Sequence, residues 1–485
     1  MLSRCARSAS RSFSKTARKP RRALTTSSSL SSPSASTPRQ QSAWAAATES
    51  AHSVLTPPSA PSSSTATSLD DPLSAINAEI GNLKSSLWRM LGSSNASLDT
   101  VAKYYFQAEG KHLRPLLVLL MSQATNGLGG RGWEQVQLEG RGRSMDDSLT
   151  VEGGVLNDWN PEVYGSEPTT NSMVFADPFR IPNPSSSSQQ RPPPPPPILP
   201  SPFDSTISSP GEPSILPTQR RLASITEMIH VASLLHDDVI DASDLRRGTP
   251  SAPSAFGNKL SILSGDFLLG RASVALARLG SSEVVELLAT VIANLIEGEV
   301  MQLRATSEPE KAPTQKGFED YMRKTYLKTA SLMAKSARAA VILGGCGGGV
   351  TKEGDWVKDV AYGYGRNLGI AFQLIDDALD FLPPDPTLGK PSLGADLRLG
   401  LATAPALFAW EKYPDLGPLI LRKFSEPGDV EIAREIVGKS DGLARTVDLA
   451  RQFAGEARSL VEMLPPSGAR DALVQLTVKV VERVK

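Results

Sequence analysis

Helical periodicity in the second half of this sequence is the feature that most restricts its fold. From Pro217 to the C-terminus, apolar residues recur every three or four positions with few breaks, as in QRRLASITEMIHVASLLHDDVID. Residues 282–295 repeat this pattern behind a serine and a glutamate, which is typical of a helix N-terminus. No segment alternates as a half-buried strand does. We therefore predict an all-α protein built as a large helical bundle.

The N-terminal region has a different composition. Residues 1–40 contain nine Arg and Lys, many Ser and no acidic residue, which predicts a mitochondrial transit peptide, with a basic disordered tail as the alternative. Residues 41–69 form a predicted disordered linker rich in Ser, Thr, Pro and Ala. Helical spacing begins near residue 70, so we predict that the folded domain spans 70–485.

A long insertion is predicted inside this domain at residues 125–216. Apolar periodicity is lost there, and the segment contains GGRG, SSSSQQ and the six prolines 192–197. Such a composition buries too little apolar surface to offset the loss of chain entropy, which predicts disorder. The proline run serves either as a solvated spacer or as a polyproline ligand, and the spacer is favoured.

Charge and residue content exclude several classes of protein. Lys plus Arg and Asp plus Glu are balanced at 51 each, which removes the electrostatic basis for wrapping nucleic acid. Two Cys and four His exclude a disulfide scaffold and a structural zinc site of the usual kind. No run of about 18 apolar residues occurs, so any membrane contact is expected to be peripheral.

Two acidic clusters with the same spacing carry the strongest functional signal. Three aspartates lie in LLHDDVID and three more in FQLIDDALD, and each set lies within apolar helical sequence. Carboxylates three and four residues apart share one helix face, where they repel one another unless cations hold them. One such cluster is usually a solvated helix face, but the second copy favours a paired Mg²⁺ site that grips a diphosphate.

Several short segments, in this order, resemble the trans-polyprenyl diphosphate synthases. They are GKHLRP, EMIHVASLLHDDVIDASDLRRG, GDFLLGRA, KTYLKTASL and GIAFQLIDDALDFLP. The resemblance covers about residues 70–124 and 217–485 and is strongest to the mitochondrial long-chain enzymes that make the ubiquinone side chain, the hexaprenyl to decaprenyl diphosphate synthases. Two departures are visible, namely the insertion and His112, which stands where Arg or Lys is often found.

The resemblance implies a fold, an activity and partners. It implies the isoprenoid synthase fold, a helical bundle around a deep central cavity, in a homodimer or a heteromer with a related subunit. The activity would be Mg²⁺-dependent condensation of isopentenyl diphosphate onto farnesyl or geranylgeranyl diphosphate, with about three ions per site and Mn²⁺ as a substitute. The expected location is the mitochondrial matrix, with peripheral contact to the inner membrane.

The resemblance also implies roles for individual residues. Metal ligands would be Asp237, Asp238, Asp241, Asp376, Asp377 and Asp380, with Asp380 an indirect member. Isopentenyl diphosphate would be bound by Lys111, Arg114, His230 and Arg247. The allylic diphosphate would be bound by Arg246, Lys328 and Lys390, and Thr329 and Gln373 would lie near the reacting carbons. Taken singly, each cation is more often a surface charge, and His230 more often a structural histidine.

The helix geometry around the first cluster suggests how product length is set. Ala232 and Ser233 lie about 7 Å below Asp237 along the helix, and both are small. In the short-chain relatives bulky aromatics near this position act as a floor, so small residues imply a long product of about six to ten isoprene units by this resemblance. The alternative is that small side chains only let two helices approach closely.

Other functions remain open at this stage. A geranylgeranyl-type synthase would share the same motifs, and a terpene cyclase or diphosphate hydrolase would need only the first cluster. A non-catalytic subunit of a prenyl synthase would be expected to have lost aspartates, and this chain retains all six.

Overall fold

The computed structural model describes most of the chain from residue 79 onward. The described residues are 79–81, 83, 87–88, 90–92, 95–107, 112–140, 214–246, 248–307, 311–347, 352–382 and 394–483. The predicted transit peptide (1–40), the predicted linker (41–69) and most of the predicted insertion lie outside them. The predicted start of the folded domain at residue 70 also lies outside them and stays a prediction.

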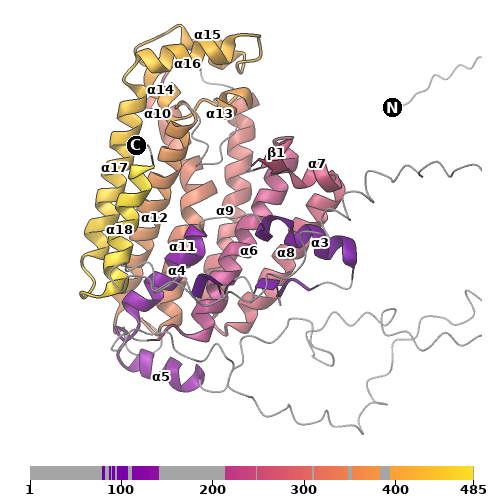
Figure 1. Cartoon of the computed structure of the whole chain (residues 1–485). Coiled ribbons are helices and arrows are strands. Elements are labelled where there is room, and N and C mark those ends of the chain that lie inside the picture. The colour runs from indigo at the N-terminus through magenta and orange to yellow at the C-terminus, as the bar shows by residue number, and fades with distance from the viewer. Residues whose placement is uncertain are drawn as a thin grey trace, which may run out of the picture. The chain divides into compact units, whose positions relative to one another are not determined.

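The described chain folds as a helical bundle, which confirms the all-α prediction (Figure 1). The first half of the bundle contains α3 (Ala96–Gln107), α4 (Leu113–Thr125), α5 (Arg131–Gly140), α6 (Pro217–Ile240), α7 (Ala252–Phe256), α8 (Asn258–Arg278) and α9 (Ser282–Ser307). Next come α10 (Gln315–Thr325), the π-helix η2 (Tyr326–Ala330), α11 (Ser331–Leu343) and α12 (Asp355–Leu379). The last helices are α13 (Ala395–Arg398), α14 (Ala404–Trp410), α15 (Leu416–Leu421), α16 (Asp429–Lys439), α17 (Gly442–Val461) and α18 (Gly468–Glu482).

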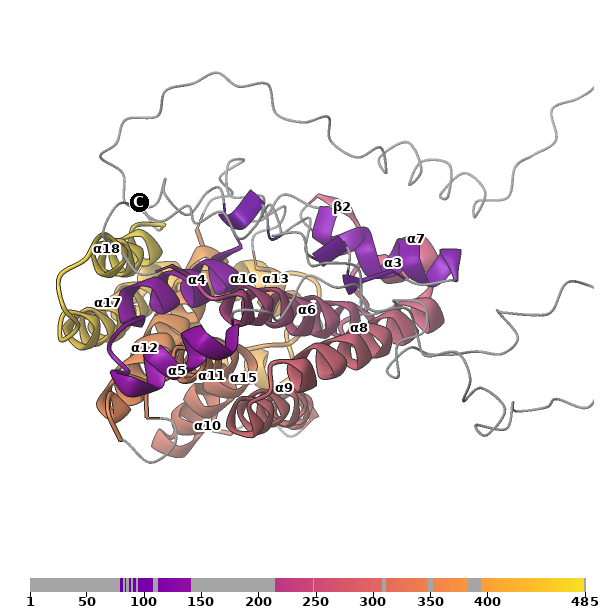
Figure 2. The same ribbon diagram turned by 90° about the horizontal axis from the view of Figure 1, so that it is seen from below.

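The long helices pack side by side, as the nearly end-on view in Figure 2 shows. α6 packs on α8, and α12 packs on both α11 and α17. The apolar stripe predicted on α6 forms the centre of the main core, where Leu222, Ile225, Ile229 and Leu235 are fully buried. Burial of each such side chain stabilises the fold by about 1.5–3 kcal/mol. This packing holds α6 firmly enough to present the aspartates at its end.

The predicted disordered insertion starts too early. The described residues between 125 and 140 include α5, and the turn before it packs against the turn after α11. A Cβ on Gly132 would lie 2.1 Å from the carbonyl oxygen of Gly345, so only glycine permits this backbone contact. The glycines of GGRG therefore serve close packing there, a role that their composition alone cannot distinguish from disorder. The segment 141–213 lies outside the described residues.

A short hairpin, with two strands of two residues each, follows α6 and was not predicted. β1 (Leu245–Arg246) pairs antiparallel with β2 (Thr249–Pro250), with Arg246 opposite Thr249. The Thr249 hydroxyl donates to the Arg246 carbonyl at 2.8 Å. The pair is too short to show any alternation in sequence. Its importance is that it carries Arg246.

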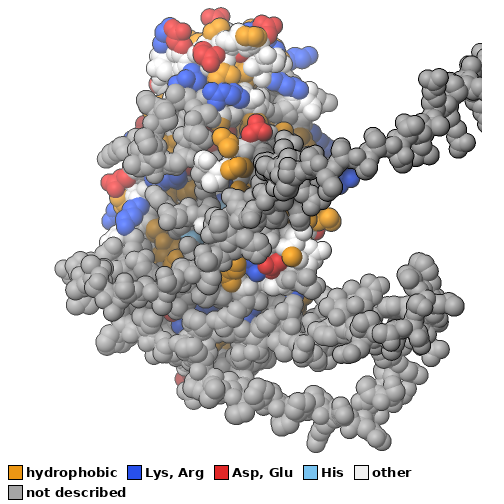
Figure 3. Space-filling view, turned by 45° about the vertical axis from the view of Figure 1, so that its right-hand side comes forward, with side chains coloured by type: hydrophobic (Ala, Val, Ile, Leu, Met, Phe, Trp, Pro, Cys, Tyr) orange, Lys and Arg blue, Asp and Glu red, His pale blue; other side chains and the backbone are white. Residues whose placement is uncertain are grey.

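One described helix, α8, is long and apolar enough to cross a membrane by composition, although no such helix was predicted. It contains Lys259, Asp266, Arg271 and Arg278 and packs along α6, as a bundle helix does. At the top of Figure 3, where α15 and α16 lie in Figure 1, the described surface mixes acidic, basic and hydrophobic side chains.

Candidate active site

Both acidic clusters lie at the C-terminal ends of long helices. Asp237, Asp238 and the C-cap Asp241 end α6, and Asp376, Asp377 and the C-cap Asp380 end α12. The C-terminal end of a helix carries the negative end of its dipole, where carboxylates are unfavourable. Each cluster must therefore be balanced by other groups, and the structure shows how far the protein itself does so.

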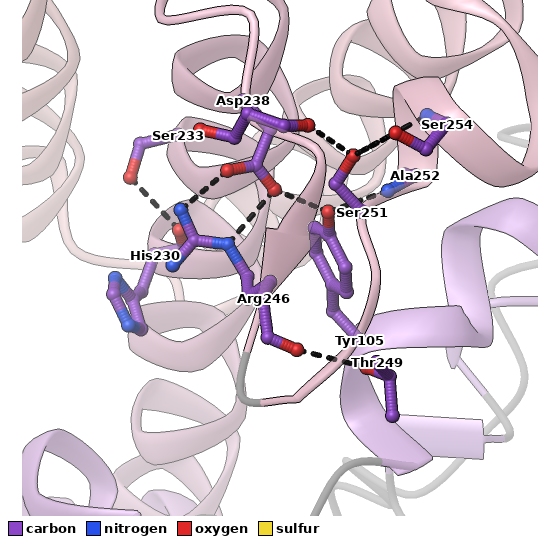
Figure 4. A network of polar contacts seen from close by, with 10 residues as sticks. Tyr105, His230, Ser233, Asp238, Arg246, Thr249, Ser251, Ala252 and Ser254 are labelled. Carbon is purple, nitrogen blue, oxygen red and sulfur yellow. Dashed lines mark hydrogen bonds and ion pairs between the residues drawn. The ribbon is translucent and has the colours of Figure 1, made fainter. Parts of the chain in front are cut away.

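Asp238 is held entirely by protein donors (Figure 4). It is buried, with 1% of its surface exposed. Arg246 binds both of its carboxylate oxygens, with Nε 2.8 Å from Oδ2 and Nη2 2.6 Å from Oδ1. The hydroxyl of Tyr105 on α3 also donates to Oδ2. In this structure Asp238 thus anchors Arg246, and its role as a metal ligand stays a prediction.

Asp237 and Asp241 face a further carboxylate, that of Glu299 on α9. Burial, followed by the charge of Glu299, raises the pKa of Asp237 to about 8. Burial also raises the pKa of Asp241, with Glu299 again contributing. Lys328 opposes both shifts and forms an ion pair with Glu299. Three carboxyl groups thus lie near one ammonium group at the end of α6, and without a further cation the raised pKa favours a proton on Asp237.

The π-helix η2 places Lys328 and Thr329 beside the two clusters. A π-turn inside an α-helix is rare and often occurs at functional sites, because it shifts the side chains that follow it. Lys328 Nζ also donates to the Gln302 side chain at 3.1 Å. Thr329 Oγ1 donates to Gln373 Oε1 at 2.8 Å. η2 therefore links α9, near the first cluster, to α12, which carries the second.

The second cluster is largely bonded within the protein. Asp377 accepts hydrogen bonds from the Tyr321 hydroxyl at 2.5 Å and from Gln373 Nε2 at 2.8 Å. Asp380 accepts the backbone N–H groups of residues 395 and 396 at 3.0 and 3.1 Å, which fixes the start of α13. Asp376 forms an ion pair with Arg483 of the C-terminal segment, with 3.2 Å between Nη2 and Oδ1.

Residues predicted to bind isopentenyl diphosphate meet at the start of α4. Arg114 Nη1 lies 2.9 Å from His230 Nε2. His112 Nδ1 lies 3.0 Å from a carboxylate oxygen of Glu227, and both side chains are nearly buried. His112 also has a left-handed backbone with φ of 39°, which is uncommon for a residue other than glycine. Three further predicted ligands, Lys111, Arg247 and Lys390, lie outside the described residues.

The two residues predicted to set product length differ in exposure. Ala232 is fully buried in the main core. Ser233 is half-buried, and its hydroxyl donates to the His230 carbonyl at 2.8 Å. Ser233 is also one turn before Asp237, so both side chains share one face of α6.

Sequence reasoning missed several residues of this site. They are Tyr105, Glu227, Glu299, Gln302, Tyr321, Lys324 and Arg483. Glu299 and Gln302 could have been found from their three-residue spacing in an apolar helix, and Lys324 from its position one turn before Lys328. Nothing in the local sequence distinguishes Tyr105 from its neighbour Tyr104.

A cavity of about 860 Å³ adjoins the site. Gln302, Tyr321 and Lys324 line it, together with apolar residues such as Met301 and Phe318. Burial lowers the pKa of Lys324, with the charge of Asp377 opposing this shift. In the part of the chain that the structure describes, no three Asp, Glu, His or Cys side chains converge closely enough to hold an ion.

Relatives with the same architecture decide the family. Residues 205–437 match the polyprenyl synthetase family. The chain is 47% identical to the "Probable hexaprenyl pyrophosphate synthase, mitochondrial" of Yarrowia lipolytica, over 87% of this chain and 86% of that protein. It belongs to the polyprenyl synthetase family.

Further similarities agree. The chain is 41% identical to decaprenyl-diphosphate synthase subunit 1 of Schizosaccharomyces pombe, over 84% of this chain and 90% of that protein. The crystal structure of a Caulobacter crescentus polyprenyl synthase, complexed with calcium and isoprenyl diphosphate, matches with a TM-score of 0.61 at 27% identity. That match covers 87% of this chain and 99% of the bacterial chain.

These findings confirm several predictions. The fold is that of the isoprenoid synthases, and the chain is a prenyltransferase, a long-chain polyprenyl diphosphate synthase. The Caulobacter relative was crystallised with the divalent cation calcium, and the name of the Yarrowia relative describes that protein as mitochondrial.

Proposed function

We propose that this chain builds the polyprenyl side-chain precursor of ubiquinone in the mitochondrial matrix. It would add isopentenyl diphosphate repeatedly to farnesyl or geranylgeranyl diphosphate, and it would need Mg²⁺. The two acidic clusters at helix C-termini, each beside a basic side chain, are the observation that carries this proposal. The names of the relatives support a product of between six and ten isoprene units.

The residues at the first cluster fit a hard divalent cation. Asp237, Asp241 and Glu299 are three carboxyl groups beside the one ammonium group of Lys328, and burial with the charge of Glu299 raises the pKa of Asp237 to about 8, so a bound dication would relieve the repulsion among them. Mg²⁺ takes one or two carboxylates and completes its shell with water and phosphate oxygens. We propose Asp237 and Asp241 as ligands, together with Asp376 of the second cluster, which would exchange its ion pair with Arg483 for the cation.

The other three aspartates are each held by two or more protein donors. Asp238, Asp377 and Asp380 each accept at least two hydrogen bonds from protein donors. They would therefore hold Arg246, Gln373 and the start of α13 in place, while the remaining aspartates face the ions.

The chain's own cations would bind the two diphosphates. Arg246 and Lys328 would hold the allylic diphosphate together with Lys390, with Arg246 using the donors that Asp238 leaves available. Arg114 and His230, with Lys111 and Arg247, would hold isopentenyl diphosphate. When bound, Mg²⁺ would neutralise charge that develops on the departing diphosphate.

The remaining polar residues would guide the allylic carbocation that forms when the diphosphate leaves. The hydrogen-bonded pair Thr329 and Gln373 would orient their oxygens toward the reacting carbons. The isopentenyl double bond then attacks the cation, and the proton released can pass to the diphosphate. No protein nucleophile is required, since electrostatic stabilisation supplies most of the rate enhancement.

Substitution of the first cluster tests this function. Asp237→Ala should abolish condensation of labelled isopentenyl diphosphate with farnesyl diphosphate, while helical circular dichroism stays intact. Asp359→Ala is the matched control, because the Asp359 side chain is 83% exposed and lies near the N-terminal end of α12, away from the second cluster at its C-terminal end. Near-normal turnover by Asp237→Ala would refute the metal assignment. A cyclised or hydrolysed product from the unchanged chain would instead favour a cyclase or a hydrolase.

We also propose that two copies of the chain associate through α8 and α9. Large apolar side chains are exposed on both helices, namely Ile262, Leu263, Ile296, Val300 and Leu303. The two helices are consecutive and pack on each other, so these residues lie toward the same end of the helical pair. Leu263→Glu should yield a monomer in analytical ultracentrifugation. A dimer that survives this change would place the interface elsewhere.

A further inference from the structure

Tyr105 connects three separate parts of the active site. It lies on α3, with 7% of its surface exposed. Its hydroxyl donates to Asp238 Oδ2 at the end of α6, and the same oxygen accepts the backbone N–H of Ala252 at 2.7 Å. Its ring lies 5.8 Å from the Arg246 guanidinium carbon. Figure 4 shows the tyrosine between the aspartate, the arginine and the start of α7.

These contacts restrain the hairpin that carries Arg246 from both sides. Before the hairpin, the N–H of Ser243 donates to the Asp238 carbonyl at 3.0 Å. After it, the Ser251 hydroxyl donates to the Ser243 carbonyl at 2.5 Å, and the hydroxyl of Tyr105 holds the next residue. The exposed hairpin therefore has a buried base.

The guanidinium group of Arg246 uses only some of its nitrogen donors to bind Asp238. Nε and Nη2 are bound to Asp238. Nη1 makes no hydrogen bond to the described part of the chain, and 28% of the side chain is exposed. An arginine whose rotamer is fixed in this way loses less entropy when it binds an anion.

We propose that Tyr105 is a positioning residue for the allylic diphosphate. It fixes the Asp238 carboxylate and the base of the hairpin, so that Arg246 presents Nη1 to the substrate. This inference rests on the proposed role of Arg246. Burial raises the pKa of the Tyr105 hydroxyl, so it remains a donor throughout the neutral pH range.

The test compares two substitutions that each remove a single buried hydroxyl. Tyr105→Phe keeps the ring and its contact with Arg246 but removes both hydrogen bonds. Tyr364→Phe is the control, because among the described residues the hydroxyl of this fully buried tyrosine bonds only the Leu473 carbonyl, at 2.7 Å. Both variants should fold with similar losses of thermal stability, measured by circular dichroism.

Steady-state kinetics then separate positioning from stability. Tyr105→Phe should raise KM for farnesyl diphosphate about tenfold, the effect expected when a hydrogen bond to a charged group is lost. KM for isopentenyl diphosphate should change less than about twofold, and Tyr364→Phe should change neither constant. An unchanged KM for farnesyl diphosphate, or an equal rise for both substrates, would overturn the proposal.

A double-mutant cycle distinguishes failure of this inference from failure of the proposed function. In an Arg246→Ala background, Tyr105→Phe should raise KM for farnesyl diphosphate no further. If both single changes raise this KM and their effects multiply fully, Tyr105 acts independently of Arg246 and the inference is wrong. If Arg246→Ala alone leaves KM unchanged, the proposed role of Arg246 fails, and with it the basis for this inference.

Discussion

At the scale of single residues, six aspartates that look alike in sequence have different surroundings. Asp238 is bound by Arg246 and Tyr105, whereas Asp237 lies near another carboxylate, and its pKa is raised to about 8 by burial and that charge. The repeated spacing predicted that the carboxylates cluster. It could not predict which of them the protein satisfies, because the partners come from distant segments: Tyr105 is 133 positions from Asp238.

Asp380 tests the distinction between aspartates that are bound by protein donors and aspartates that are left to bind metal. Its carboxylate caps the start of α13, so Asp380→Ala should lower the free energy of unfolding by about 1 kcal/mol, as for other lost caps. Turnover should fall much less than in Asp237→Ala. Urea denaturation and steady-state assays measure the two effects. Complete loss of turnover at unchanged stability would make Asp380 a metal ligand.

Cys346 should react very slowly in the folded protein. Burial raises its pKa to about 11, so few molecules carry the reactive thiolate at pH 8. In a Cys5→Ser variant, labelling by a thiol reagent should accelerate steeply between about pH 9 and 11, while the unfolded chain, with a pKa near 8.5, reacts quickly at pH 8. Because the folded pKa is the higher one, this group's stabilising effect is lost as pH rises above about 8.5. Equal labelling of both states at pH 8 would show that Cys346 is accessible.

At the scale of elements, the long helices were predictable and their contacts were not. The apolar stripe of α6 was evident from its spacing, because helix formation and burial use the same three-to-four-residue period. The β1–β2 hairpin and α5 depend on tertiary contacts, such as Gly132 against Gly345, and local composition conceals these.

Two glycines on α12 align the second half of the site. A Cβ on Gly365 would lie 2.6 Å from the Met333 carbonyl oxygen, and one on Gly369 would lie 2.7 Å from the Ala330 Cα. Gly369 is one helical turn before Gln373, and the residue it packs against, Ala330, follows Thr329, which is hydrogen-bonded to Gln373. The close approach of α12 to η2 and α11 therefore positions this pair.

Gly369→Ala should force these helices apart. We expect a loss of about 1–3 kcal/mol in unfolding free energy, as for other overpacked sites, and reduced turnover. Gly455→Ala on α17 is the control, because a Cβ there meets no described residue within 4 Å and should leave stability equal or slightly higher. Thermal denaturation compares the two variants. Equal stabilities would show that the α12 contact tolerates a methyl group.

At the scale of the whole molecule, product length depends on the space below the first cluster. Ser233 shares the face of Asp237 and is half-buried, so Ser233→Phe should shorten the product while it preserves the first condensation. Ala232 is fully buried, and Ala232→Phe should also cost about 1–3 kcal/mol of stability through overpacking. Chromatography of the dephosphorylated products reads chain length. Unchanged products from both variants would place the growing chain elsewhere.

The most direct test of the whole account is the product of the unmodified enzyme. The chain should be incubated with Mg²⁺, labelled isopentenyl diphosphate and farnesyl diphosphate, and the product separated by length. We predict an all-trans polyprenyl diphosphate of about six to ten units, formed only when the divalent metal is present. A product that stops at about four units, or synthesis that continues in a chelator, would contradict the account.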